Sequence, residues 1–211
     1  MIARVKHVLI LAALMLFSMQ VAAQETEQER EPFDDRYCMT CHGIDGVGNF
    51  GVQAPRLAGM EPWYLERQLK LFRDGLRGKH PEDTEGLAMQ PMAVLTDESI
   101  TDIVAWVGTW EYKPAPATIT AGDKEHGESL YQTCATCHGI NAEGNESMNA
   151  PALAGQNDWY LVTQLQNFKA GYRGYRDDDV YGSQMRQMSG VLQTRQDIID
   201  VVSYINTLRK L

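Results

Sequence analysis

Apolar residues recur every three to four positions in four stretches of the chain, which is the spacing of amphipathic helices. These stretches are 63–76, 100–107, 159–171 and 198–205. Thr96 and Thr194 stand shortly before two of them, where a hydroxyl side chain typically caps the start of a helix. No run alternates apolar and polar residues as a half-buried strand does, so the pattern predicts an all-α fold.

The sequence repeats itself at a spacing of 96 residues. About half of the positions from Cys38 to Met92 are identical to those from Cys134 to Met188, and the match contains no gap. The shared positions include a Cys-x-x-Cys-His motif, a Pro-x-Leu-x-Gly stretch, a Trp-Tyr-Leu-x-x-Gln-Leu stretch and a Met-x-x-Met pair. The mature protein is therefore expected to contain two copies of one domain.

The repeat places these domains at 24–110 and 123–211. The segment 111–122 between them is predicted to be a linker, because Pro114 and Pro116 remove backbone donors and favour an extended chain. Each copy is small enough that a bound cofactor is expected to help stabilise its core.

The first 23 residues have the layout of a secretory signal peptide. Arg4 and Lys6 precede an apolar run at 8–17, and a small-residue site ends at Ala23. This run is shorter than the roughly 20 residues that a membrane-spanning helix needs, which argues against an uncleaved anchor. We therefore expect cleavage after Ala23 and a location in a bacterial periplasm.

The overall charge disfavours a nucleic-acid partner. The 211 residues carry a formal net charge of −9, and without residues 1–23 the charge becomes −11, so no cationic surplus exists to displace phosphate counterions. Four cysteines are too few for a disulfide scaffold of this length. An acidic protein of this kind is expected to dock on partners that carry a basic patch.

The cysteines form two Cys-x-x-Cys-His motifs, Cys38 to His42 and Cys134 to His138. This spacing is the attachment signal of c-type haem, in which two thiols bind the porphyrin and the adjacent His reaches the iron. A zinc ribbon needs no His after each pair, and a thioredoxin motif needs a β-α-β pattern. A plain disulfide within each motif stays open, but two motifs in register in an exported protein favour two covalently bound haem c groups.

Each copy offers further candidate iron ligands. A methionine pair follows each haem motif at the same distance, Met89 with Met92 and Met185 with Met188. Methionines at such spacing can simply fill a core. His80 and His126 are rival ligands, but neither has a histidine at the matching position of the other copy. The repeat therefore favours one methionine of each pair.

These motifs, taken together, resemble the di-haem cytochromes c of the cytochrome c4 family over almost all of the mature chain. The resemblance implies two tandem class I cytochrome c domains related by a pseudo-two-fold axis. It also implies that the first methionine of each pair binds iron, Met89 and Met185, and that the carbonyls of Pro55 and Pro151 orient the proximal histidines.

Other residues are candidate contacts of the haem propionates. They are Arg77, Arg173, Trp63, Trp159, Tyr64 and Tyr160. A guanidinium fork suits a carboxylate, although each of these side chains could equally be a helix-end charge or a core aromatic. The related family brings the propionate edges of both haems to the domain interface, so we expect these helices to meet there.

The two copies differ at their first helix and after the methionine pair. The second copy has Gly127 and Tyr131, which resemble the family's helix-crossing contacts, whereas the first copy has Glu31 and Asp35. We therefore expect a shortened first helix in the first copy. After the methionines the register slips by two residues, which leaves Met188 open as an alternative to Met185.

An iron with both axial positions filled has no open site for substrate, so the predicted function is single-electron transfer. The resemblance implies a quinol–cytochrome c reductase as donor and a terminal oxidase or periplasmic reductase as acceptor, with any membrane association arising through such partners. The alternatives are a di-haem peroxidase or thiosulfate dehydrogenase, which needs an open or unusual ligand, and an electron-entry subunit of a larger complex.

The duplicated motif predicts two haems per chain after expression with a haem c maturation system, measured by the pyridine haemochrome assay. Replacing Cys134 and Cys137 together by Ala should leave one haem and a folded first domain, because the linker separates the two cores. One haem or none in the unmodified chain would contradict the assignment.

Overall fold

Helices account for all the regular structure in residues 36–208, which are the residues described by the computed structural model. The α-helices are α2 (Arg36–His42), α3 (Pro62–Arg73), α4 (Thr84–Met89), α5 (Asp97–Val107), α6 (Lys124–His138), α7 (Asp158–Ala170), α8 (Val180–Met188) and α9 (Arg195–Ile205). Short 3-10 turns are at Ile44–Gly46, Phe50–Val52, Gln90–Ala93, Glu146–Met148, Ser189–Val191 and Asn206–Leu208. The prediction of an all-α fold is confirmed.

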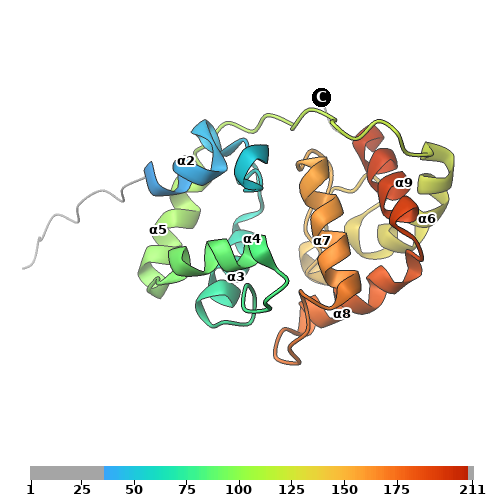
Figure 1. Cartoon of the computed structure of the whole chain (residues 1–211). Coiled ribbons are helices and arrows are strands. Elements are labelled where there is room, and N and C mark those ends of the chain that lie inside the picture. Colours follow the sequence, from blue (N-terminus) through green and yellow to red (C-terminus); the bar gives the residue numbers. More distant parts are fainter. Residues whose placement is uncertain (1–35, 209–211) are drawn as a thin grey trace, which may run out of the picture. The chain divides into compact units, whose positions relative to one another are not determined.

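Figure 1 shows α2 to α5 as one group of helices and α6 to α9 as a second group, joined by a single connection. We call residues 36–110 the first half, 111–122 the connection and 123–208 the second half. All of these described residues belong to one compact unit. No helix in the described part of the chain is long and apolar enough to span a membrane. The predicted signal peptide at 1–23 lies outside the described residues.

The first half packs α3 against α5. Leu65 and Leu69 on α3 are buried with Ile100 and Ile103 on α5, the spacing that the sequence pattern predicted. Thr96 caps α5 by accepting the Ser99 N–H at 3.1 Å. The predicted shortening of the first helix concerns residues before Arg36, so it lies outside the described part of the chain.

The second half is built on a close crossing of α6 and α9. Tyr131 is 1% exposed, and a Cβ on Gly127 would collide with the backbone oxygen of Asp200, so only glycine allows the helices to approach this closely. The predicted helix-crossing role of Gly127 and Tyr131 is confirmed. Thr194 caps α9 in a capping box with Asp197, as expected from the sequence.

The connection packs on the second half. Residues 111–122 contain no helix or strand, and Ala115 is buried with its N–H bonded to the Gly155 carbonyl at 3.1 Å. The buried Asp158 carboxylate accepts hydrogen bonds from Thr118 and from the Ile119 N–H. Burial opposes ionisation of Asp158, but these bonds hold its pKa below the usual value.

A buried carboxylate ties the start of α6 to α9. Asp200 is 2% exposed and accepts hydrogen bonds from the Asp123 N–H (2.8 Å), from Gln196 (2.8 Å) and from His126 Nδ1 (2.9 Å). Burial alone would raise the pKa of Asp200, yet these bonds lower it. The Asp200 hydrogen bond is the main cause of a raised pKa at His126.

This pair predicts a pH window of stability. Ionised Asp200 stabilises the fold above its ordinary pKa, and this contribution is lost as the pH falls through its lowered pKa. Protonated His126 stabilises the fold below its ordinary pKa, and this contribution is lost as the pH rises through its raised pKa. His126→Gln should therefore be less stable than the parent at about pH 5 and nearly equal to it at about pH 9. Denaturant unfolding at both pH values measures this, and an equal gap at both would contradict it.

Candidate functional site

The His42 side chain is fixed by one hydrogen bond in the first half. Its Nδ1 donates to the Pro55 carbonyl at 2.7 Å, which leaves Nε2 unprotonated with its lone pair available. The ring is 8% exposed, and this burial lowers the pKa of His42 and favours the neutral imidazole, although the hydrogen bond acts in the opposite direction. A neutral, oriented imidazole is the form that binds a metal.

The second half repeats this arrangement. His138 Nδ1 donates to the Pro151 carbonyl at 2.7 Å, the ring is 7% exposed, and burial lowers the pKa of His138. A positive-φ glycine follows each histidine and turns the chain at once, Gly43 at 79° and Gly139 at 82°. The carbonyl role predicted for the two prolines therefore matches the geometry in both halves.

The four cysteines lie in the helical turns that end at these histidines. Cys38 and Cys41 are in α2, Cys134 and Cys137 are in α6, and none of the four is in a disulfide. The disulfide alternative is not formed in this structure. Residues i and i+3 share one face of a helix, so both thiols of a pair reach the same side.

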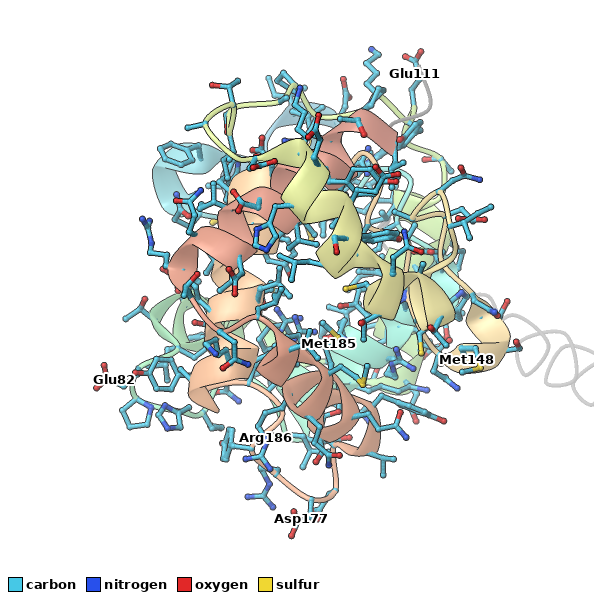
Figure 2. All side chains as sticks on the ribbon, turned by 90° about the vertical axis from the view of Figure 1, so that its right-hand side faces the viewer. Glu82, Glu111, Met148, Asp177, Met185 and Arg186 are labelled. Atoms are coloured by element: carbon cyan, nitrogen blue, oxygen red, sulfur yellow. The ribbon has the colours of Figure 1, made fainter. Side chains whose placement is uncertain are left out.

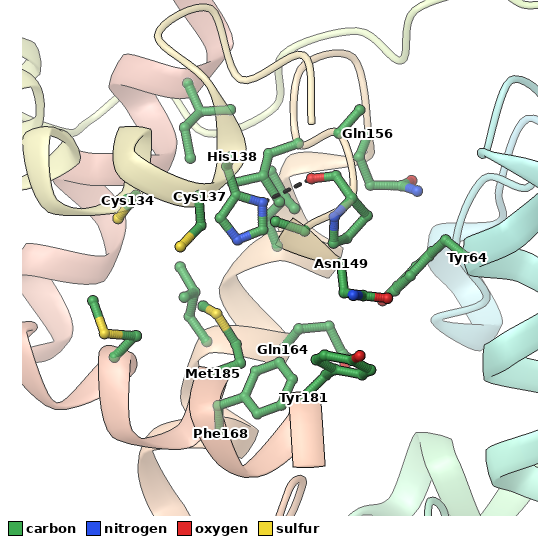
Figure 3. A pocket seen from close by; sticks show the side chains of 18 of the residues that line it. Tyr64, Cys134, Cys137, His138, Asn149, Gln156, Gln164, Phe168, Tyr181 and Met185 are labelled. Atoms are coloured by element: carbon green, nitrogen blue, oxygen red, sulfur yellow. Dashed lines mark hydrogen bonds between the residues drawn. The ribbon is translucent and has the colours of Figure 1, made fainter. Parts of the chain in front are cut away.

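A cavity of about 520 Å³ lies beside the second motif, and its wall includes Cys134, Cys137, His138 and Met185. Figure 3 shows His138 and Met185 on opposite sides of this cavity, and in Figure 2 Met185 borders the open space at the centre of the second half. Met188 also lines the cavity, but its side chain is 42% exposed. The geometry favours Met185 as the residue that faces His138.

The methionines of the first half show the same contrast. Met89, the last residue of α4, is partly buried and packs on the apolar cluster that contains Leu57 and Leu65. Met92 is 50% exposed. The rival histidines are engaged elsewhere: His80 stacks on Tyr172 with ring centroids 4.8 Å apart, and His126 binds Asp200.

The predicted propionate contacts converge where the halves meet. Arg77 donates to Gln68 of its own half (2.7 Å) and to Tyr160 (3.1 Å) and Gln164 (3.2 Å) of the other. Arg173 donates to Gln164 of its own half (2.7 Å) and to Tyr64 (3.0 Å) and Gln68 (2.9 Å) of the first. Arg77, Gln68 and Tyr64 are each 96 positions before Arg173, Gln164 and Tyr160. The two groups of contacts are therefore related by the pseudo-two-fold symmetry of the repeat.

A second exchange of hydrogen bonds follows the same relation. Glu61 of the first half accepts the N–H of Ala152 at 2.6 Å, and Asn157 of the second half accepts the N–H of Arg56 at 2.7 Å. The expectation that the helices bearing Tyr64 and Tyr160 meet at a pseudo-two-fold interface is confirmed.

The tryptophans lie at the edge of this interface. Trp63 packs edge-on against Tyr64, with ring centroids 5.7 Å apart, while Trp159 is 9% exposed and meets Phe50 of the first half at 5.7 Å. Tyr160 lies close to both interface arginines. Burial alone would raise the pKa of Tyr160, but the positive charges of Arg77 and Arg173 outweigh burial, so the pKa is lowered.

Two arginines that the sequence reasoning missed also enter the interface. Arg56 donates to the Lys113 carbonyl at 3.1 Å and lies over the Tyr112 ring, while Arg67 donates to Asn149. Both line the cavity of the second half. The signal that could have found them is their departure from the repeat, because the matching positions hold Ala152 and Thr163.

These arginines provide the test of whether the site fits haem c. Within residues 36–208, the hydrogen bonds of Arg56, Arg67, Arg77 and Arg173 go to neutral acceptors and none goes to a carboxylate. The Nε groups of Arg56, Arg67 and Arg77 are buried without a partner. Buried guanidinium groups need anionic partners, and each haem c brings two propionate carboxylates, so the residues present fit the cofactor.

The comparisons with known proteins agree with this geometry. The cytochrome c family model matches the chain twice, at residues 30–111 and 124–209. Cytochrome c4 of Azotobacter vinelandii is 31% identical over 186 residues, which covers 81% of this chain and 84% of the relative. The chain belongs to the cytochrome c4 family. It therefore carries two covalently bound haem c groups and is a di-haem electron-transfer cytochrome.

The chain is similar to three further proteins, one curated relative and two solved structures. A protein of Stutzerimonas stutzeri named thiosulfate dehydrogenase electron acceptor is 33% identical over 165 residues, 72% of each chain. The cytochrome c4 structure of Acidithiobacillus ferrooxidans superimposes with a TM-score of 0.66 at 28% identity and covers 81% of this chain and 97% of that one. Thiosulfate dehydrogenase TsdBA of Marichromatium purpuratum gives 0.64 at 29% identity, but only 36% of its chain is covered.

Proposed function

We propose that this cytochrome carries single electrons in the periplasm through two haems that both have His/Met axial ligation. The observation that carries the proposal is the facing pair His138 and Met185, with the matching pair His42 and Met89 at the same spacing in the first half. Each bound haem c supplies one redox centre, and His/Met ligation favours a relatively high reduction potential.

The residues of the chain hold these centres and limit their chemistry. Pro55 and Pro151 keep each imidazole in one tautomer and orientation, so little rearrangement accompanies a change of oxidation state. A methionine on the opposite side of each haem would leave no open site for peroxide or another substrate. This arrangement supports a carrier and argues against the enzyme alternative.

The proposed roles at the interface concern the propionates. Arg77 and Arg173, with Tyr64 and Tyr160 beside them, supply donors and positive charge where the two halves meet. Carboxylates bound there would bring both haem edges to one interface, and electrons could then pass between haems within one molecule. Trp63 and Trp159 pack at the edge of this region and support its aromatic residues.

The donor is proposed to be a redox protein with a basic docking patch, because the mature chain is acidic. Quinol–cytochrome c reductase is one candidate, and a terminal oxidase or periplasmic reductase would be the acceptor. The relatives named thiosulfate dehydrogenase electron acceptor, together with the TsdBA likeness, favour thiosulfate dehydrogenase as a second candidate donor.

Replacement of the axial methionines tests the ligation. The sulfur-to-ferric-iron charge-transfer band at the red edge of the visible spectrum reports this bond, so Met89→Ala or Met185→Ala should each remove about half of it. Met92→Ala and Met188→Ala are the matched controls and should leave the band intact. Loss of the band in a control variant instead would reassign the ligand within that pair.

Stopped-flow reduction of the oxidised cytochrome tests the choice of donor. Quinol–cytochrome c reductase with quinol, and thiosulfate dehydrogenase with thiosulfate, are compared at equal concentrations. The productive pair should show a rate that falls steeply with added salt, because opposite charges guide the encounter. Slow, salt-independent reduction by both donors, or turnover of peroxide by the cytochrome alone, would contradict the proposed role.

A further inference from the structure

Arg67 occupies a position that the repeat does not reproduce. It lies on α3 of the first half, yet both terminal nitrogens of its guanidinium group bond Asn149 of the second half, one to the side-chain oxygen (2.8 Å) and one to the backbone carbonyl (2.9 Å). The matching residue, Thr163, donates its hydroxyl to the Trp159 carbonyl of its own helix at 3.1 Å. The hydrogen bonds from Arg67 to Asn149 therefore have no symmetry-related equivalent from Thr163 to the first half.

The side chain of Arg67 is built into the wall of the second haem cavity. Its guanidinium lies over the Tyr181 ring at 4.7 Å and the Trp63 ring at 5.0 Å, and Arg67 lines the same cavity as His138 and Met185. Contacts with these aromatic rings restrict the position of the planar group. The position of this charge is therefore fixed relative to the cavity.

One donor of this group has no partner. The Nε of Arg67 is buried without a hydrogen-bond acceptor, and burial lowers the pKa of Arg67. No carboxylate in residues 36–208 forms a salt bridge with Arg67. Arg67 as a whole is half-buried, but its vacant Nε is buried, and a buried donor without an acceptor is costly.

The acids on the same wall have hydrogen-bond partners of their own, although the Asp179 carboxylate also favours the charged form of Arg67 from a distance. Glu61 accepts the Ala152 N–H, Glu143 accepts the Asn141 N–H at 2.8 Å, and Asp179 accepts the Gly182 N–H at 2.9 Å as the cap of α8. The carboxylates of the haem remain as the anions that could complete the coordination of Arg67.

We propose that Arg67 is a cross-domain contact of the second haem, supplied by the first half, which raises the reduction potential of that haem and has no equivalent at the first. The inference rests on the proposed placement of the second haem between His138 and Met185. A fixed positive charge favours the reduced form, which carries one positive charge less, and the effect is strong where solvent screening is weak. Arg67 is thus a positioning and tuning residue, and the iron ligands are unchanged by it.

Redox titration of the matured full-length protein, with the haem methyl resonances of each haem followed by NMR, tests this proposal. Arg67→Gln should lower the midpoint potential of the second haem and shift that of the first much less. Arg73→Gln is the matched control, because it removes the same charge from the same helix at a site where Arg73 pairs with the exposed Asp97. Arg67→Lys keeps the charge and should retain most of the parent potential.

Equal shifts at both haems, equal shifts in the Arg67 and Arg73 variants, or no shift at all would overturn the proposal. If Arg67→Gln does not load both haems, Asn149→Asp gives a second test, because a carboxylate beside the guanidinium neutralises its charge. That variant should also lower the potential of the second haem, and an unchanged potential would overturn the proposal. The methionine charge-transfer band is measured in the same variants. If the band is intact while the potential is unchanged, the role of Arg67 is refuted and the proposed axial ligation is not.

Discussion

The burial of guanidinium groups among neutral partners is the constraint on which the structure depends. Arg77 and Arg173 are 7% and 6% exposed, and within the described residues their hydrogen bonds go to glutamine and tyrosine side chains. Burial of such groups carries a desolvation cost. At Arg173 the hydrogen bond to Tyr64 and the nearby Tyr160 and Asp179 side chains offset this cost, and the pKa of Arg173 is raised. In the proposed function the propionates of the two haems are the anions that join this interface. Cofactor binding and the packing of the two halves would then be coupled through the same arginines.

The pseudo-two-fold relation explains why one set of residues serves two sites. Gln68 and Gln164 each accept from both arginines, so each half completes the network of the other. A symmetric interface would give both haems the same surroundings. Arg56 and Arg67 break this equality, because Ala152 and Thr163 stand at the matching positions. Gene duplication provides the common frame, and a few unrepeated charges can then make the two redox centres different.

Much of this account could be predicted from the sequence because its signals are local or repeated. The Cys-x-x-Cys-His motifs, the helical periodicity of α3 and α5, and the caps at Thr96 and Thr194 depend on neighbours within a few residues. The close crossing at Gly127 followed from a family resemblance. The partners of Arg77 and Arg173 could not be predicted, since hydrogen bonds between positions 83 to 109 residues apart leave no periodic pattern in the sequence. Arg67 gives no repeat signal, because Thr163 stands at the matching position, and its proposed role depends on that difference.

The central claim is that both haem edges meet at the buried interface of arginine, glutamine and tyrosine side chains. A crystal structure of the matured protein tests it most directly, by locating the propionates of both haems. The account predicts that they lie against Arg77 and Arg173, with Arg67 beside the second haem and the two haem edges facing each other. Propionates that point to solvent on opposite outer faces, with the guanidinium groups still bound only to neutral side chains, would contradict it.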